Sequence, residues 1–203
     1  IEIDREGIKE AIIEFVGFYN QLVTQIDILT RNDTSIIDDT YFLEEEEKEL
    51  AEQNLGLLQG DITLSQMKSR LRTMVSEEYF TSGDLRLLAE IGISTDVTMP
   101  GSQTGLNMTK LRGYLEIDEE KLDEALERQP EKIKELFGMD SDGDYVVDSG
   151  IGSVINNYIQ PFINIGGIIP TKMTTYDTTI ARRNEDIDDL NEYLIDYEQQ
   201  LRV

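Results

Sequence analysis

The chain has 203 residues, of which 39% are hydrophobic, and its formal net charge is -24 without any histidine or cysteine. This composition allows one domain with a buried core, but it excludes disulfides, thiol catalysis, thiolate metal ligands and the most common general base. The strong negative charge disfavours nucleic acids and anionic membranes as partners, and no stretch is long and apolar enough to cross a bilayer.

Residues 1–3 alternate apolar and acidic side chains, so we predict a strand stub that arrives from an upstream β domain. Asp4 is a favourable N-cap, and the first long helix is expected over 5–29. Apolar residues in this helix step by alternating fours and threes, which is the spacing of a coiled-coil seam. The residues of this seam are Ile8, Ile12, Phe15, Tyr19, Leu22, Ile26 and Leu29.

The acidic run at 44–52 is interpreted as a solvated helix face or a mobile loop, because adjacent glutamates on a helix cannot all face one cation. Thr63, with Gln66 three residues later, predicts a capping box at the start of a second amphipathic helix. The inward residues of that helix are Leu64, Met67, Leu71, Met74 and Val75.

The composition changes to Thr, Ser, Gly and Pro with β-branched residues over 92–118. Within it, 93–95 and 114–117 are expected to pair as a small β-hairpin, with 96–112 as a long polar tip. No conformation is predicted for that tip.

Three more helices are expected before the end of the chain. Asp118 caps the first, Pro130 begins a short helix that Gly138 closes, and apolar spacing predicts a third over 151–159 that ends near Pro161. No repeat of 20 to 50 residues is found.

A metal-like motif lies between these helices and consists of Asp140, Asp142, Asp144 and Asp148. A calcium-binding EF-hand loop needs glycine at position 6 and a bidentate acid at position 12. Counted from Asp140, the glycine falls at position 4 and Ile151 at position 12, so the motif fails at both points. We interpret it as a polar linker; a weak, adventitious calcium site is the alternative. The sequence therefore predicts no catalytic, cofactor-binding or metal-binding residues, and no enzymatic activity.

A second coiled-coil stripe fills the last segment, 172–203, and Arg183 interrupts one of its inward positions. We predict that this helix packs on 5–29 and that the helical domain spans 4–171. The fold class is then mainly α, an elongated antiparallel helical bundle or coiled coil with a small β-hairpin. The stripe consists of Met173, Tyr176, Ile180, Ile187, Leu190, Leu194, Tyr197 and Leu201.

Several short stretches, in this order, resemble the C-terminal region of the bacterial flagellar filament-capping family, also called hook-associated protein 2. Each stretch alone is unspecific, but together they span nearly the whole chain. The stretches are Ala11-Ile12, Phe15-Val16, Tyr19-Asn20 and Leu22; Leu57-Leu58-Gln59-Gly60-Asp61; Leu71-Arg72; Leu88-Ala89-Glu90-Ile91-Gly92-Ile93-Ser94-Thr95; Gly113-Tyr114-Leu115-Glu116-Ile117-Asp118; and Lys121-Leu122, Ala125-Leu126, Pro130 and Leu136-Phe137.

The resemblance implies a structural cap at the distal end of the flagellar filament, which retains exported flagellin and promotes its folding and polymerisation. It implies flagellin, other cap subunits in a homo-oligomeric ring and an export chaperone as partners, and no nucleic acid or membrane. The expected location is the flagellum, outside the cell, or in the periplasm if the flagella are internal. The segment 96–112 is longer than the family pattern leads us to expect.

Two other functions remain open at this point. One is a surface adhesin or binding module built on the same helical scaffold, and the other is a calcium-dependent module centred on Asp140, Asp142 and Asp144. Membership of a neighbouring family, flagellin or another hook-associated protein, is a variant of the structural hypothesis.

Overall fold

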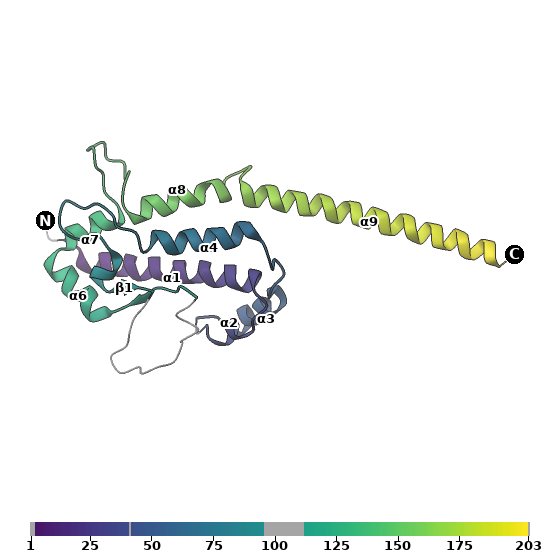
Figure 1. Cartoon of the computed structure of the whole chain (residues 1–203), viewed down its shortest axis with the longest axis horizontal. Helices are drawn as coiled ribbons and strands as arrows, with labels where there is room; N and C mark the ends of the chain where they lie inside the picture. The colour runs from purple at the N-terminus through teal and green to yellow at the C-terminus, as the bar shows by residue number, and fades with distance from the viewer. Residues whose placement is uncertain (1–2, 41, 96–111, 203) are drawn as a thin grey trace. The chain divides into compact units, whose positions relative to one another are not determined.

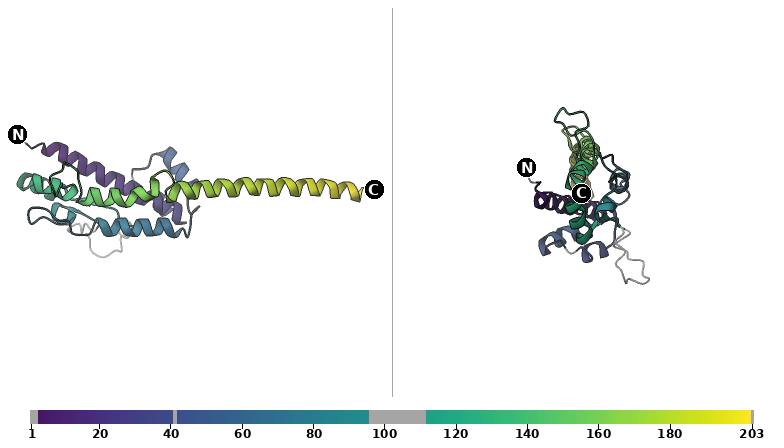
Figure 2. Two further views of the ribbon diagram at one scale, coloured as in Figure 1. Left: turned by 90° about the horizontal axis from the view of Figure 1, so that it is seen from above. Right: turned by 90° about the vertical axis from the view of Figure 1, so that its left-hand side faces the viewer.

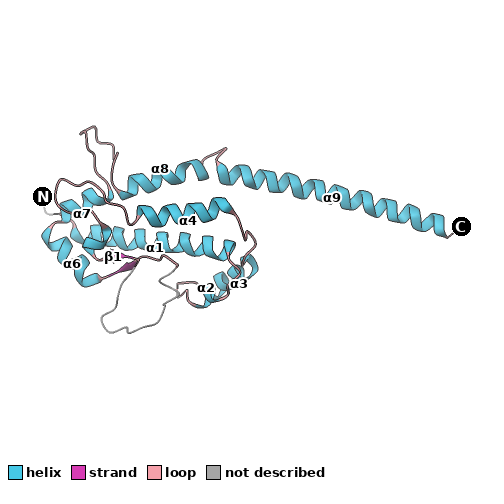
Figure 3. Ribbon diagram, in the orientation of Figure 1, coloured by secondary structure: helices cyan, strands magenta, loops and turns pink. Residues whose placement is uncertain are grey.

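The computed structural model describes residues 3–40, 42–95 and 112–202. The predicted strand stub at 1–3 and the hairpin tip at 96–112 lie almost entirely outside these ranges. Within them, helices account for most of the chain and strands for one short hairpin (Figure 3). This confirms a mainly α fold with a small β-hairpin.

The chain divides into two compact units, residues 1–155 and 156–203. The helix α8 begins in the first unit and continues into the second, and α9 lies wholly in the second (Figure 1). In chain order the elements are α1 (Arg5–Thr30), α2 (Ser35–Asp38), α3 (Glu45–Asn54), α4 (Ile62–Met74), the 3-10 helix η1 (Leu88–Ile91), β1 (Ile93–Ser94), β2 (Glu116–Ile117), α6 (Glu119–Arg128), α7 (Pro130–Phe137), α8 (Ile151–Ile163) and α9 (Ile168–Leu201).

The helix α1 forms the centre of the first unit and packs against α4, α6, α7 and the hairpin. Asp4 caps it as predicted, since its carboxylate accepts a hydrogen bond from the Gly7 N–H at 2.9 Å. Only part of the predicted seam is buried, because four of its residues remain half-buried: Ile8, Phe15, Leu22 and Leu29. The buried apolar row keeps the same spacing of fours and threes but includes two valines: Ile12, Val16, Tyr19, Val23 and Ile26.

The strands β1 and β2 pair as a hairpin, as the sequence predicts, and the structure adds the antiparallel register, with Ile93 opposite Ile117. The Asn20 side chain of α1 holds the incoming strand, donating to the Leu115 carbonyl and accepting from the Leu115 N–H, both at 2.8 Å. Gly92 precedes β1 with φ of +83°, and an added Cβ there would lie 2.8 Å from the Asp118 carbonyl oxygen. A glycine is therefore required at this turn on two counts, backbone angle and space.

Two helix ends differ from the sequence predictions. Asp61, not Thr63, caps α4, because the Asp61 carboxylate accepts a hydrogen bond from the Leu64 N–H at 3.0 Å. The helix α8 runs two residues past Pro161 to Ile163, although the proline lacks the N–H group of one backbone hydrogen bond.

Other predicted ends agree with the structure. Asp118 caps α6, Pro130 is the first residue of α7, and Gly138 ends that helix. Most of the acidic run 44–52 lies in α3 with its glutamates exposed, which confirms the helix among the two alternatives.

Candidate functional surface

The apolar stripe of α9 is the most prominent exposed feature of the second unit. This helix has 34 residues and none of them is buried. Ile187 and Leu194, at the middle of the stripe, expose 55% and 51% of their surface. The left view of Figure 2 shows α9 as one continuous helix, green to yellow, that ends at the C-terminus. Large exposed apolar patches mark interaction surfaces in soluble proteins, so the stripe is the first candidate for a functional surface.

All eight residues of the predicted stripe lie on α9 and expose about half or more of their surface. At coiled-coil spacing they form one seam along the helix. The set, with the exposed fractions, is Met173 (61%), Tyr176 (49%), Ile180 (58%), Ile187 (55%), Leu190 (56%), Leu194 (51%), Tyr197 (49%) and Leu201 (69%).

Arg183 occupies an inward position of this seam. Its guanidinium lies 3.3 Å from the Asp186 carboxylate, and both side chains are largely exposed. A charge at a seam position specifies register and partner at a cost in stability. A partner helix that covers the seam must therefore offer Arg183 an acceptor or leave it room to reach water.

The predicted packing of 172–203 on 5–29 stays a prediction. The structure adds one constraint on α1, because Ile12, Tyr19 and Ile26 of its predicted seam are already buried within the first unit. They are not available to a second helix unless the unit opens.

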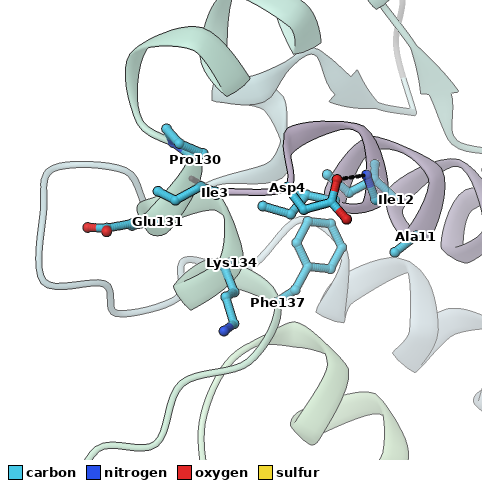
Figure 4. Close-up of a pocket in the computed structure, with 10 residues that line it drawn as sticks. Ile3, Asp4, Ala11, Ile12, Pro130, Glu131, Lys134 and Phe137 are labelled. Atoms are coloured by element: carbon cyan, nitrogen blue, oxygen red, sulfur yellow. Dashed lines mark hydrogen bonds between the residues drawn. The ribbon is translucent and has the colours of Figure 1, made fainter. Parts of the chain in front are cut away.

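A groove in the first unit is the second candidate surface. It has a volume of about 720 Å³ and lies between the start of α1 and α7 (Figure 4). Figure 4 shows the Phe137 ring turned toward α1, with the charged ends of Glu131 and Lys134 pointing away from it. The Phe137 ring meets the Phe15 ring edge to face, with centroids 5.3 Å apart. The lining of the groove is mostly apolar, and the described residues that line it include no nucleophile paired with a base.

The acidic motif folds into a tight loop that uses its own carboxylates. Asp140, Asp142 and Asp144 place one oxygen each within 4.8 Å of one another. The Asp140 carboxylate accepts hydrogen bonds from the N–H groups of Gly143 at 2.6 Å and Tyr145 at 2.8 Å. These backbone hydrogen bonds, the one from Gly143 first, lower the pKa of Asp140. The carboxylates thus stabilise the loop itself, and the absence of a metal site remains a prediction.

Among the described residues, no helix combines the length and the hydrophobicity needed to cross a membrane. The helix α9 is long, but charged and polar residues lie between the apolar residues of its stripe.

The sequence profile of the family described as "Flagellar hook-associated protein 2 C-terminus" matches residues 1–203 of the chain. The chain belongs to the flagellar hook-associated protein 2 family. Within that family it corresponds to the C-terminal region, as the motif stretches predict.

Relatives from three organisms, each named "Flagellar hook-associated protein 2", support the assignment. The protein of Treponema maltophilum is 43% identical over 94% of this chain and 28% of its own length. That of Treponema pallidum is 42% identical over 87% of this chain and 24% of its own length. That of Borreliella burgdorferi is 32% identical over 89% of this chain and 27% of its own length. The chain thus spans about a quarter of the length of these relatives.

One solved structure is also similar, that of the D1-D2-D3 domains of the flagellar cap protein FliD from Escherichia coli. The two share 23% sequence identity with a TM-score of 0.41, over 64% of this chain and 35% of the other.

Proposed function

We propose that the chain is the helical leg region of a cap at the distal end of the flagellar filament. In this role it would help to retain exported flagellin and promote its folding and polymerisation. The observation that carries the proposal is the match of the hook-associated protein 2 profile to the whole chain. The proposed role is structural, with binding and release of protein subunits in place of bond chemistry.

The exposed stripe of α9 supports this role. A helix with an apolar seam but no buried residue has surface to offer to another helix, and assembly at a filament end needs such surfaces. The proposed partners are flagellin, other cap subunits in a homo-oligomeric ring and, for the whole protein, an export chaperone. Pairing of 172–203 with 5–29 is a further proposal for how part of the stripe is covered.

The proposed location is the flagellum, outside the cell or in the periplasm where the flagella are internal. A chain without cysteine suits assembly outside the cytoplasm, because it cannot form incorrect disulfides there. The mainly helical first unit suits a protein that must refold after export, because helices form between residues that are close in the sequence.

The experiment is deletion of the full-length gene, followed by electron microscopy of the cells and immunoblotting of the culture supernatant for flagellin. The proposal predicts short or missing filaments and flagellin released into the medium. Reintroduction of the wild-type gene should restore filaments and remove flagellin from the supernatant. Normal filaments in the deletion strain would contradict the proposal and favour the adhesin alternative.

A further inference from the structure

A small polar hollow between the end of α1 and one face of α4 concentrates positive charge in an otherwise acidic chain. Its volume is about 190 Å³. The α4 residues that line it lie three or four positions apart and so share one helix face. The lining consists of Asp27, Thr30 and Arg31 from α1 and its end, and of Ser65, Lys68, Ser69 and Arg72 from α4.

The charges in this hollow do not balance. Lys68 binds both oxygens of Asp27 at 2.6 Å, and the Arg31 Nε lies 3.4 Å from the same carboxylate. One carboxylate and three cations, Arg31, Lys68 and Arg72, therefore line the hollow, which gives its lining a net charge of +2 in a chain of net charge -24.

The hydrogen-bond donors in the hollow are also in excess. The Lys68 ammonium has three N–H groups, and Asp27 accepts two of them. The Arg72 guanidinium has five N–H groups, and none has a partner among the described residues. The Arg72 side chain is exposed and lies beside Gly113, where an added Cβ would overlap it.

The environment of Lys68 also shows an excess of positive charge in the hollow. Its side chain is only 11% exposed, and desolvation by burial lowers its pKa, with Arg31 and Arg72 acting in the same direction. Asp27 opposes this shift but does not cancel it. An anion bound in the hollow would supply the missing negative charge.

We propose that this hollow binds a compact oxyanion group, either a carboxylate or a phosphate. Arg72 holds it through its planar fork, Arg31 and the third N–H of Lys68 complete the charge, and the Ser69 hydroxyl is a further donor. The guanidinium fork matches the two oxygens of a carboxylate or phosphate, which suits both groups. The proposal rests on the geometry of α1 and α4 and not on the proposed function.

The test is a titration of the isotope-labelled chain by ¹H–¹⁵N NMR at low ionic strength. One arm uses inorganic phosphate and the other N-acetylglutamate, each against sodium chloride at the same ionic strength. We expect saturable shifts confined to the amides of 27–31 and 65–72 in at least one arm. Saturation by phosphate alone identifies a phosphate site, and saturation by N-acetylglutamate identifies a site for a protein carboxylate.

Matched variants separate a built site from diffuse charge. Arg72→Gln should weaken binding about tenfold, because it removes a charged donor of the ligand. Arg72→Lys keeps the charge without the fork and should give an intermediate loss. Arg128→Gln removes the same charge from an exposed position on α6 and should bind as the wild type does. Shifts equal to those with chloride, or equal losses for Arg72→Gln and Arg128→Gln, would overturn the proposal.

Discussion

The helices α1 and α9 have the same apolar spacing but opposite environments. Ile12 and Ile26 of α1 are 2% and 3% exposed, whereas Ile187 and Leu194 of α9 are 55% and 51% exposed. The heptad pattern shows how much apolar surface a helix offers, and it does not show which segment covers that surface. In the first unit the covering elements follow α1 in the chain, whereas no residue of α9 is buried by the described part of the second unit.

The polar contacts of the two helices differ in the same way. Asn20 of α1 binds Leu115, which is 95 residues away, and Asp27 binds Lys68, which is 41 residues away. Two side chains of α9 bind locally instead: Thr178 donates to the Thr174 carbonyl at 2.8 Å, and Arg183 donates to Asp186 at 3.3 Å. Long-range polar contacts thus fix α1 within its unit, whereas Thr178 and Arg183 of α9 bind residues of their own helix.

The largest effect is expected at the buried ion pair of α1 and α4. Lys68→Met should lower the free energy of unfolding of the first unit by about 3 to 5 kcal/mol, because it leaves the buried Asp27 carboxylate without its main partner. Urea unfolding, followed by near-ultraviolet circular dichroism of the buried tyrosines, measures this. Lys121→Met breaks an exposed pair with Asp118 and should cost less than about 1 kcal/mol. Equal losses would contradict the structural importance of the buried pair.

The next contrast compares one substitution on both helices. Ile28→Ala in α1 should cost about 2 to 5 kcal/mol, because Ile28 is fully buried in a cluster with Ile36, Ile37, Leu43 and Ala51. Ile187→Ala in α9 should change stability by less than about 0.5 kcal/mol, because that side chain is already half exposed. The urea midpoints of the two variants provide the comparison. A large loss for Ile187→Ala would show that α9 is covered in the isolated chain.

A third contrast separates backbone strain from packing within the first unit. Gly60 and Gly92 have almost the same φ, +84° and +83°, but only Gly92 has neighbours within 4 Å of an added Cβ. Gly60→Ala should therefore cost about 1 to 2 kcal/mol for the left-handed backbone alone. Gly92→Ala should cost about 2 to 4 kcal/mol, because the methyl group also overlaps the start of α6. Thermal unfolding measures both, and equal costs would show that the turn before β1 is not tightly packed.

The smallest effect concerns the alkaline limit of stability. Burial raises the pKa of Tyr79 to about 12, and burial raises that of Tyr19 as well. Between about pH 10 and 12 the unfolded tyrosine loses its proton while the folded one retains it, so stability falls as the pH rises. The slope reaches at most about 1.4 kcal/mol per pH unit for each tyrosine.

Tyr79→Phe tests this pH dependence. It should cost about 1 kcal/mol at pH 7, through loss of the hydrogen bond to the Met74 carbonyl, and should flatten the decline above pH 10. Urea midpoints at pH 7, 9 and 11 measure both effects. Tyr176→Phe on α9 should leave all three midpoints where the wild type has them. A decline as steep in Tyr79→Phe as in the wild type would contradict the role of Tyr79.

Features that depend on neighbouring residues could be predicted from the sequence. Asp4 and Asp118 can be predicted as caps, because a cap binds an N–H group only three residues ahead in the chain. The two strands of the hairpin were placed correctly because β-branched residues flank a polar stretch. Asp61 was missed in favour of Thr63, since both precede the same apolar run and both are good capping residues.

Features that depend on packing could not be predicted in this way. Arg31, Lys68 and Arg72 share one hollow only because α1 and α4 lie side by side, and nothing in their spacing indicates it. Asn20 is likewise a polar residue between apolar positions of α1, and its hydrogen bond to Leu115 forms only in the folded unit. The residues of the α9 stripe can be predicted, because their apolar spacing identifies them whichever segment covers them.

The central claim is that the exposed stripe of α9 is an interaction surface. Complementation of the deletion strain with full-length variants tests it most directly. Ile187→Asp places a charge on the stripe, and Ile195→Asp places the same charge on another face of α9 at an equal exposure, 55% against 56%. Swimming, filament length and flagellin in the supernatant are scored for strains that secrete equal amounts of each variant. The account predicts lost filaments with Ile187→Asp and normal filaments with Ile195→Asp. Normal filaments with both variants would contradict it.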